Sequence, residues 1–155
     1  MAANVEARPR IVIFACNWEA YRGLEEVGKN RQGFPAQARV VRLPCLARLH
    51  PGLILKAFQM GADGVLVLGC PPDRCHFGVG GESATEVFAQ SSALLCLLGF
   101  APHRLALHSV PDGSGEACAE RIRAFAARLV ENGVNHKDTK TPREAKELYL
   151  EGVIV

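Results

Sequence analysis

The feature that most constrains the fold is a regular alternation of short apolar segments with amphipathic ones. Four apolar segments are rich in β-branched and aliphatic residues and are short enough to be buried strands. A segment with helical periodicity or helix-end signals follows each of them. The predicted strands are 10–16, 38–45, 63–70 and 103–110, and the predicted helices are 19–32, 50–61, 81–100 and 114–133. This order predicts an α/β fold with a doubly wound, mostly parallel four-stranded sheet of the flavodoxin-like type.

The composition is that of an ordinary globular domain. The chain has 155 residues, of which 48% are hydrophobic and 22% charged. A formal net charge of +2 and an aromatic content of 6% argue against a nucleic-acid-binding protein. We expect residues 1–133 to form the domain. The polar and then apolar segment 134–155 departs from the alternation, so we expect a C-terminal extension that docks on the core or on a partner.

The sequence predicts a cytoplasmic protein that is not attached to a membrane. The N-terminal segment lacks a secretory pattern, and the apolar run at 11–16 is too short to span a bilayer. Six cysteines in a reducing compartment are unlike a disulfide framework. They indicate metal binding or catalysis instead.

Four of the cysteines fall at or just after predicted strand ends. Cys16, Cys45 and Cys70 end the first three strands, and Cys75 follows in the next loop. The carboxyl ends of parallel strands share one edge, and neighbouring strands lie about 5 Å apart, so we expect these thiols to meet. Four thiolates can hold either zinc or a 2Fe–2S cluster, and the spacing leaves both open.

Other candidate features receive structural interpretations. Cys96 and Cys118 lie within predicted helices, on or near apolar faces, and are expected to be core residues. The glycine-rich segment 78–83 precedes a helix and could offer amides to a phosphate, but it lacks the dinucleotide-binding fingerprint, so we interpret it as a flexible loop. His76 is expected to be hydrogen-bonded beside the thiol centre.

Three segments carry a resemblance to a known family. They are FACNWEAYRG at 14–23, VVRLPCLARLHP at 40–51 and GADGVLVLGCPPDRCHF at 61–77. Together they resemble the delta subunit of methyl-viologen-reducing hydrogenase, in the same order along the chain. At two positions where that family has cysteines, this chain has Ala15 and Glu19.

The resemblance implies a small, non-catalytic electron-transfer subunit with one 2Fe–2S cluster. By motif, the implied ligands are Cys16, Cys45, Cys70 and Cys75. The implied partners are a hydrogenase or formate dehydrogenase subunit on one side and the flavin-bearing, heterodisulfide reductase A-like subunit on the other, in complexes that often perform electron bifurcation. Two alternatives remain at this point: a zinc-stabilised interaction module, and a flavodoxin-like domain that binds flavin or a nucleotide.

Overall fold

The computed structural model describes residues 8–33 and 37–133 of the chain. Its centre is a sheet of four strands, β1 (Ile11–Cys16), β2 (Ala38–Leu43), β3 (Gly64–Gly69) and β4 (Leu105–Ser109). All neighbouring strands pair in parallel, in the order β2-β1-β3-β4. This confirms the predicted α/β fold with a parallel four-stranded sheet.

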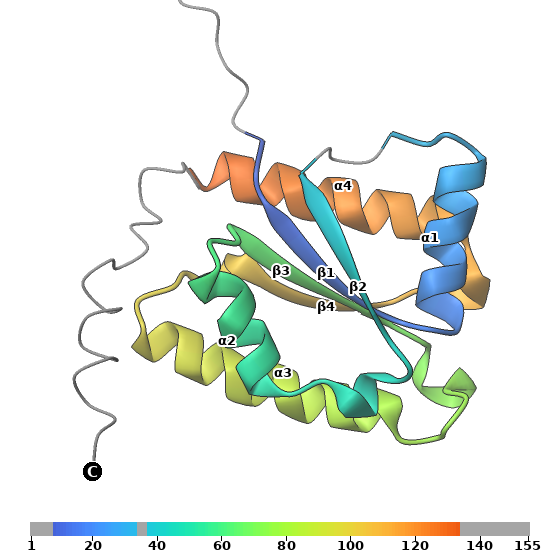
Figure 1. Cartoon of the computed structure of the whole chain (residues 1–155), viewed down its shortest axis with the longest axis horizontal. Helices are drawn as coiled ribbons and strands as arrows, with labels where there is room; N and C mark the ends of the chain where they lie inside the picture. The colour runs from blue at the N-terminus through green and yellow to red at the C-terminus, as the bar shows by residue number, and fades with distance from the viewer. Residues whose placement is uncertain (1–7, 34–36, 134–155) are drawn as a thin grey trace, which may run out of the picture.

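Four helices cover the two faces of this sheet. They are α1 (Glu19–Lys29), α2 (Pro51–Gln59), α3 (Gly80–Leu97) and α4 (Gly115–Glu131). Helices α1 and α4 pack together on one face, and α2 and α3 pack together on the other (Figure 1). Because helices lie on both sides, the central strands are buried on both faces and read as continuous apolar runs.

The core is centred on β3, where all six residues are buried. Helix α4 contributes one buried face, on which Cys118, Ile122, Phe125 and Leu129 are all at most 1% exposed. Strand β2 lies at an edge of the sheet, and most of its residues are exposed. Its apolar character therefore reflects edge pairing with β1 rather than deep burial.

Helix and strand ends follow local chemistry. The hydroxyl of Ser114 accepts a hydrogen bond from the Ala117 N–H and so caps α4. Before α2, His50 Nδ1 accepts a bond from the Gly52 N–H. Both caps lie at helix N-termini and so fix where α2 and α4 begin. The expected C-terminal extension, 134–155, lies outside the described residues.

No helix in the described part of the chain is both long enough and apolar enough to cross a bilayer.

Candidate functional site

The carboxyl edge of the sheet brings the predicted cysteines together. Cys16 is the last residue of β1, Cys45 follows β2, and Cys70 follows β3 directly. Strand β1 lies between β2 and β3, so these three ends are neighbours in space. Cys75 ends the short turn Pro72–Arg74 that follows β3. The strand order thus delivers three thiols to one edge, and the next loop adds a fourth.

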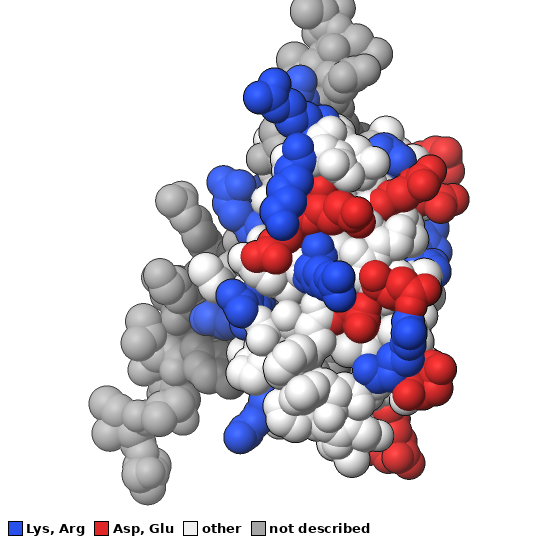
Figure 2. All heavy atoms as spheres, turned by 90° about the vertical axis from the view of Figure 1, so that its right-hand side faces the viewer, with Lys and Arg blue, Asp and Glu red and all other residues white. Residues whose placement is uncertain are grey.

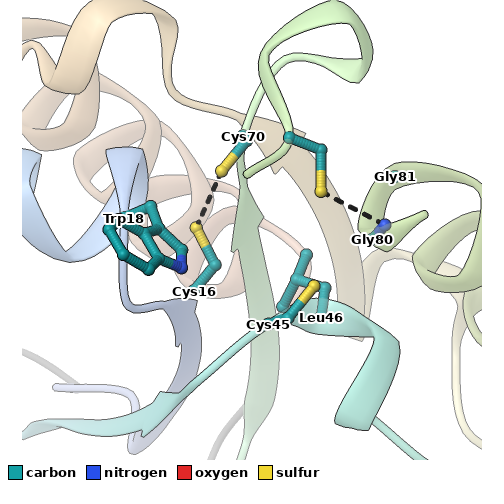
Figure 3. A pocket seen from close by; sticks show the side chains of 8 residues that line it. Cys16, Trp18, Cys45, Leu46, Cys70, Gly80 and Gly81 are labelled. Atoms are coloured by element: carbon teal, nitrogen blue, oxygen red, sulfur yellow. Dashed lines mark hydrogen bonds between the residues drawn. The ribbon is translucent and has the colours of Figure 1, made fainter. Parts of the chain in front are cut away.

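These four cysteines share one small pocket (Figure 3). Its free volume is about 10 Å³, far below that of a cleft for an organic ligand. A pocket of this size suits a small inorganic centre held directly by the side chains around it. The lining residues are Cys16, Trp18, Cys45, Leu46, Cys70, Cys75, Gly80 and Gly81.

The thiols form two close pairs. Cys16 Sγ lies 3.3 Å from Cys70 Sγ (Figure 3). The thiols of Cys45 and Cys75 both adjoin Gly80 and interact with each other electrostatically. The pairs are close enough for Cys16 to interact electrostatically with Cys45, and Cys75 with Cys70. The pocket is therefore a cluster of four thiols arranged two by two.

Backbone amides point at three of the sulfur atoms. The Gly80 N–H donates to Cys75 Sγ at 3.2 Å, and the Ala47 N–H donates to Cys45 Sγ at 3.4 Å. The backbone of Glu19 makes a hydrogen bond to Cys70. Since a sulfur acceptor gains strength from negative charge, these amides favour thiolates over thiols.

Burial and the amides act in opposite directions on the thiol pKa values. Burial raises the pKa of Cys70 to about 12 and also raises the pKa of Cys45. Burial acts the same way on Cys75, but backbone N–H groups, chiefly that of Gly80, outweigh it and lower the pKa of Cys75. The thiols of Cys45 and Cys70 thus favour the neutral form until a positive charge enters the pocket.

The positions of the sulfur atoms can be compared with those expected around a single metal ion. Within residues 8–33 and 37–133, no three His, Cys, Asp or Glu side chains are grouped as ligands of a single metal ion. Tetrahedral zinc with Zn–S bonds of about 2.3 Å would hold all four sulfurs roughly 3.8 Å from one another. Cys16 Sγ and Cys70 Sγ lie closer together than that, at 3.3 Å.

A cluster of aromatic rings adjoins the pocket through Trp18. The Trp18 indole lines the pocket and stacks on His76, with ring centroids 3.6 Å apart and planes at 15°. Phe77 packs edge-on against both rings, at 6.2 Å from Trp18 and 4.8 Å from His76. We call Trp18, His76 and Phe77 the aromatic cap. The ring of His76 therefore stacks on an indole next to the thiols.

The two remaining cysteines lie elsewhere. Cys118 is fully buried in α4, as expected for a core residue, and burial raises its pKa to about 11. Cys96 is exposed on α3, so the expectation of a core position was wrong there. The cause is that α3 carries apolar residues around its circumference, including exposed Leu94 and Leu97, so periodicity does not identify its buried face.

The glycine-rich segment has a role that the sequence analysis missed. It forms the first turn of α3, where Gly80 approaches two sulfurs so closely that a Cβ atom would lie 2.7 Å from Cys45 Sγ and 2.9 Å from Cys75 Sγ. Its amide also binds Cys75. A glycine-rich helix start five residues after a cysteine was the available signal, and it was interpreted as a flexible loop.

A larger cavity lies away from this site. It measures about 710 Å³ and opens between α2 and the β1–β2 side of the sheet, where its lining includes Arg10, Phe14, Val41, Lys56 and Met60. None of the predicted site residues contributes to its lining. The larger cavity is therefore separate from the thiol pocket.

Comparison with known proteins fixes the family. Residues 11–133 match the family model described as methyl-viologen-reducing hydrogenase, delta subunit. The chain belongs to this family. The match spans the whole described domain from β1 to the end of α4, so the resemblance seen in the first half of the sequence extends through the second half as well.

Individual relatives fall into two kinds. The D-type iron-sulfur subunit of the F420-non-reducing hydrogenase of Archaeoglobus profundus is 37% identical over 124 residues, covering 80% of this chain and 90% of the relative. The corresponding hydrogenase subunit of Methanococcus voltae is 37% identical over 116 residues, which cover 75% of this chain and 79% of the relative. These relatives are single subunits of about the same extent as the domain.

The second kind is a much longer protein. The A-type subunit of the ferredoxin:CoB-CoM heterodisulfide reductase of Methanosarcina mazei is 35% identical over 125 residues, covering 81% of this chain. The chain spans only 16% of that relative's length. The same domain therefore occurs both as a separate hydrogenase subunit and as a segment within a heterodisulfide reductase subunit.

Proposed function

We propose that this protein is an electron-transfer subunit that carries one 2Fe–2S cluster, bound by Cys16, Cys45, Cys70 and Cys75. It relays electrons between a hydrogenase or dehydrogenase partner and a flavin-containing, heterodisulfide reductase A-like subunit, in a cytoplasmic, electron-bifurcating complex. The observation that carries this proposal is the convergence of four thiols in one pocket, with Cys16 and Cys70 in contact and Cys45 and Cys75 both beside Gly80.

The pocket fits an iron–sulfur cluster in three respects. Four cysteine thiolates are the usual ligand set of a 2Fe–2S cluster, with two sulfurs on each iron. The pairs Cys16–Cys70 and Cys45–Cys75 match that division, whereas a single zinc ion would need four evenly spaced sulfurs. Gly80 leaves free the space that a side chain would take from the centre.

When bound, the cluster supplies a centre that accepts and returns one electron. The protein determines the reduction potential at which the cluster takes up this electron. Amides of Gly80, Ala47 and Glu19 donate to the sulfurs and stabilise negative charge. The buried surroundings of the thiols, in turn, disfavour added charge. The balance of these two effects determines the reduction potential.

The relatives support the partners in this proposal. One relative is named as a hydrogenase iron-sulfur subunit, and another contains the domain within the A-type subunit of a heterodisulfide reductase. In the second relative, the domain and the rest of the subunit are one chain, which holds them at high effective concentration. We therefore expect the separate domain to contact an A-like subunit as well. A formate dehydrogenase as electron donor follows from the family resemblance.

Anaerobic purification tests the proposal. We expect a coloured protein with about two irons and two sulfides per chain, with broad visible absorption that dithionite bleaches and an electron paramagnetic resonance signal on reduction. A colourless protein that releases zinc on treatment with thiol reagents would contradict the proposed cluster and indicate a structural zinc site. A yellow protein that loses its colour on denaturation would indicate flavin.

Matched cysteine variants assign the ligands. We expect Cys45→Ser or Cys70→Ser to abolish the visible chromophore, because each removes one member of a thiol pair. Cys118→Ser is the control, since Cys118 is buried in α4 outside the pocket. A full chromophore in Cys70→Ser would exclude that residue from the ligand set.

A further inference from the structure

Apolar side chains next to the thiol pocket are exposed to solvent. Trp18 is 39% exposed, Phe77 54% and Val79 52%. Trp18 follows β1, whereas Phe77 and Val79 lie in the loop between Cys75 and α3, so two segments distant in sequence build one apolar surface. Exposed apolar residues that contact one another and adjoin a functional site are typical of an interaction surface.

This surface differs from the other exposed apolar positions. Met60 and Leu97 are more exposed, at 76% and 85%, but neither lines the thiol pocket. Trp18 alone among the exposed large apolar residues of the described chain is part of the pocket wall. Its indole therefore connects the interior of the site with the molecular surface.

One charged side chain beside this surface is paired within the chain. Arg74, in the same loop, forms an ion pair with Asp112. Figure 2 shows the carboxyl-edge side of the molecule, where a mainly uncharged area lies in the lower middle, with cationic and acidic side chains around it. A partner that docks here is held by apolar burial rather than by charge attraction.

We propose that Trp18, His76, Phe77 and Val79 form the docking face for the flavin-containing, heterodisulfide reductase A-like subunit, and that the electron leaves the Cys16–Cys70 end of the site through the Trp18 indole. This rests on the proposed function above. In the transfer, one electron leaves this chain and one enters the acceptor, and no covalent bond is made or broken.

Two observations favour the A-like subunit as the protein that docks on the aromatic cap. The domain occurs inside a heterodisulfide reductase protein in the Methanosarcina mazei relative, so contact with that protein does not require a third component. The aromatic cap is the part of the described surface where aromatic rings adjoin the thiols, and an acceptor must approach the centre closely. Together they favour the A-like subunit over the other partner as the occupant of the cap.

Photo-crosslinking within the intact complex tests the docking face. A p-benzoylphenylalanine is introduced at Phe77 or, as the matched control, at the exposed Leu97 on α3. We expect position 77, but not position 97, to crosslink to the A-like subunit, as identified by mass spectrometry of the crosslinked peptides. A crosslink from position 77 to the hydrogenase subunit, or from position 97 to the A-like subunit, would overturn the assignment.

Purified proteins then separate docking from electron transfer. We expect Phe77→Ser with Val79→Ser to weaken binding by at least tenfold to the purified A-like subunit, with Leu97→Ser as the control and little change in affinity between low and moderate salt. Trp18→Leu, when saturated with the A-like subunit, is expected to reoxidise at least tenfold more slowly than wild type after reduction, and Trp18→Phe to recover part of the rate. Equal rates in Trp18→Leu and wild type would remove the indole from the path.

The two proposals fail in different ways. A wild-type protein without an iron–sulfur spectrum would end the proposed function, whatever position 77 crosslinks to. An intact spectrum together with unchanged affinity in the Phe77 and Val79 variant would end only the docking proposal.

Discussion

The two edges of the parallel sheet differ in how their polar groups are satisfied. At the amino edge, the buried Asp63 carboxylate accepts a hydrogen bond from the Arg10 N–H at 2.7 Å, and the Arg10 side chain lies 3.7 Å away. Arg104 donates to the carbonyl oxygens of Asp63 and Ala62. At the carboxyl edge, four thiols contact mainly one another and backbone amides.

This difference suggests that the polar groups of the amino edge stabilise the fold, whereas those of the carboxyl edge are arranged for a cofactor. The amino edge pairs its charges within the chain, and it ties the start of β1 to the start of β3. The carboxyl edge collects groups that protein neighbours do not neutralise, and its amides are arranged for negative sulfur. We therefore expect changes at the amino edge to affect folding and changes at the carboxyl edge to affect cofactor content.

The largest effect on stability is expected from Asp63→Ala. The change removes the acceptor for the Arg10 N–H and the negative partner of the Arg10 side chain. Leaving these groups without the carboxylate should lower the free energy of unfolding by about 3 kcal/mol, as measured by chemical denaturation. Asp63→Asn keeps an acceptor of the same shape and should cost less. Equal losses in the two variants would contradict this account.

Matched glycine variants at the two edges sharpen the comparison. At Gly64, a Cβ would lie 2.7 Å from Leu129 Cδ1 and 2.9 Å from the Phe125 ring, so Gly64→Ala should lower stability by about 1–2 kcal/mol with the spectrum of the folded protein unchanged. At Gly80, the Cβ would instead meet two sulfurs. Gly80→Ala should therefore reduce the bound iron and sulfide per chain, with little change in the stability of the metal-free protein.

The neighbouring glycine provides the control for the carboxyl edge. A Cβ at Gly81 would lie 3.5 Å from Pro72 Cα, an ordinary contact distance. Gly81→Ala should keep its iron content, which is measured together with visible absorption. If Gly80→Ala and Gly81→Ala retain equal iron, the close approach of Gly80 to the sulfurs has no bearing on cofactor binding.

The smallest expected effect is a pH dependence at the amino edge. Burial, and then the cations Arg104 and Arg128, lower the pKa of His103 below its ordinary value of 6.5. The unfolded chain therefore binds a proton at this residue at higher pH than the folded chain does. Stability from this source is complete above about pH 6.5 and declines as the pH falls below it.

A glutamine variant isolates this contribution. In His103→Gln, the decline in unfolding free energy between pH 7.5 and pH 5.5 should be shallower than in wild type, while His108, whose pKa is also lowered, titrates in both proteins. The measurement is a denaturation midpoint at each pH. Parallel pH profiles for the two proteins would show that His103 has no share in the decline.

The elements and the meeting of strand ends were predictable from sequence for local reasons. Continuous apolar runs identified the strands, and prolines such as Pro44 marked where they stop. Right-handed crossovers then require parallel neighbours, which bring Cys16, Cys45 and Cys70 to one edge. Each of these steps uses only residues close together in the chain.

The remaining details of the site depend on contacts between distant segments. The pairing of Cys16 with Cys70, and of Cys45 with Cys75, is determined by how the loops pack and has no signature in residue spacing. The close approach of Gly80 to the sulfurs arises because α3 begins beside the turn that follows β2. The stacking of Trp18 on His76 joins residues from two loops.

The position of Trp18 also has a consequence for the order of assembly. The same indole forms a wall of the pocket and part of the exposed surface. A partner protein that covered this surface would also block the approach of iron and sulfide from that side. Maturation of the free chain would then have to precede its incorporation, and chains that reach the complex empty would remain empty.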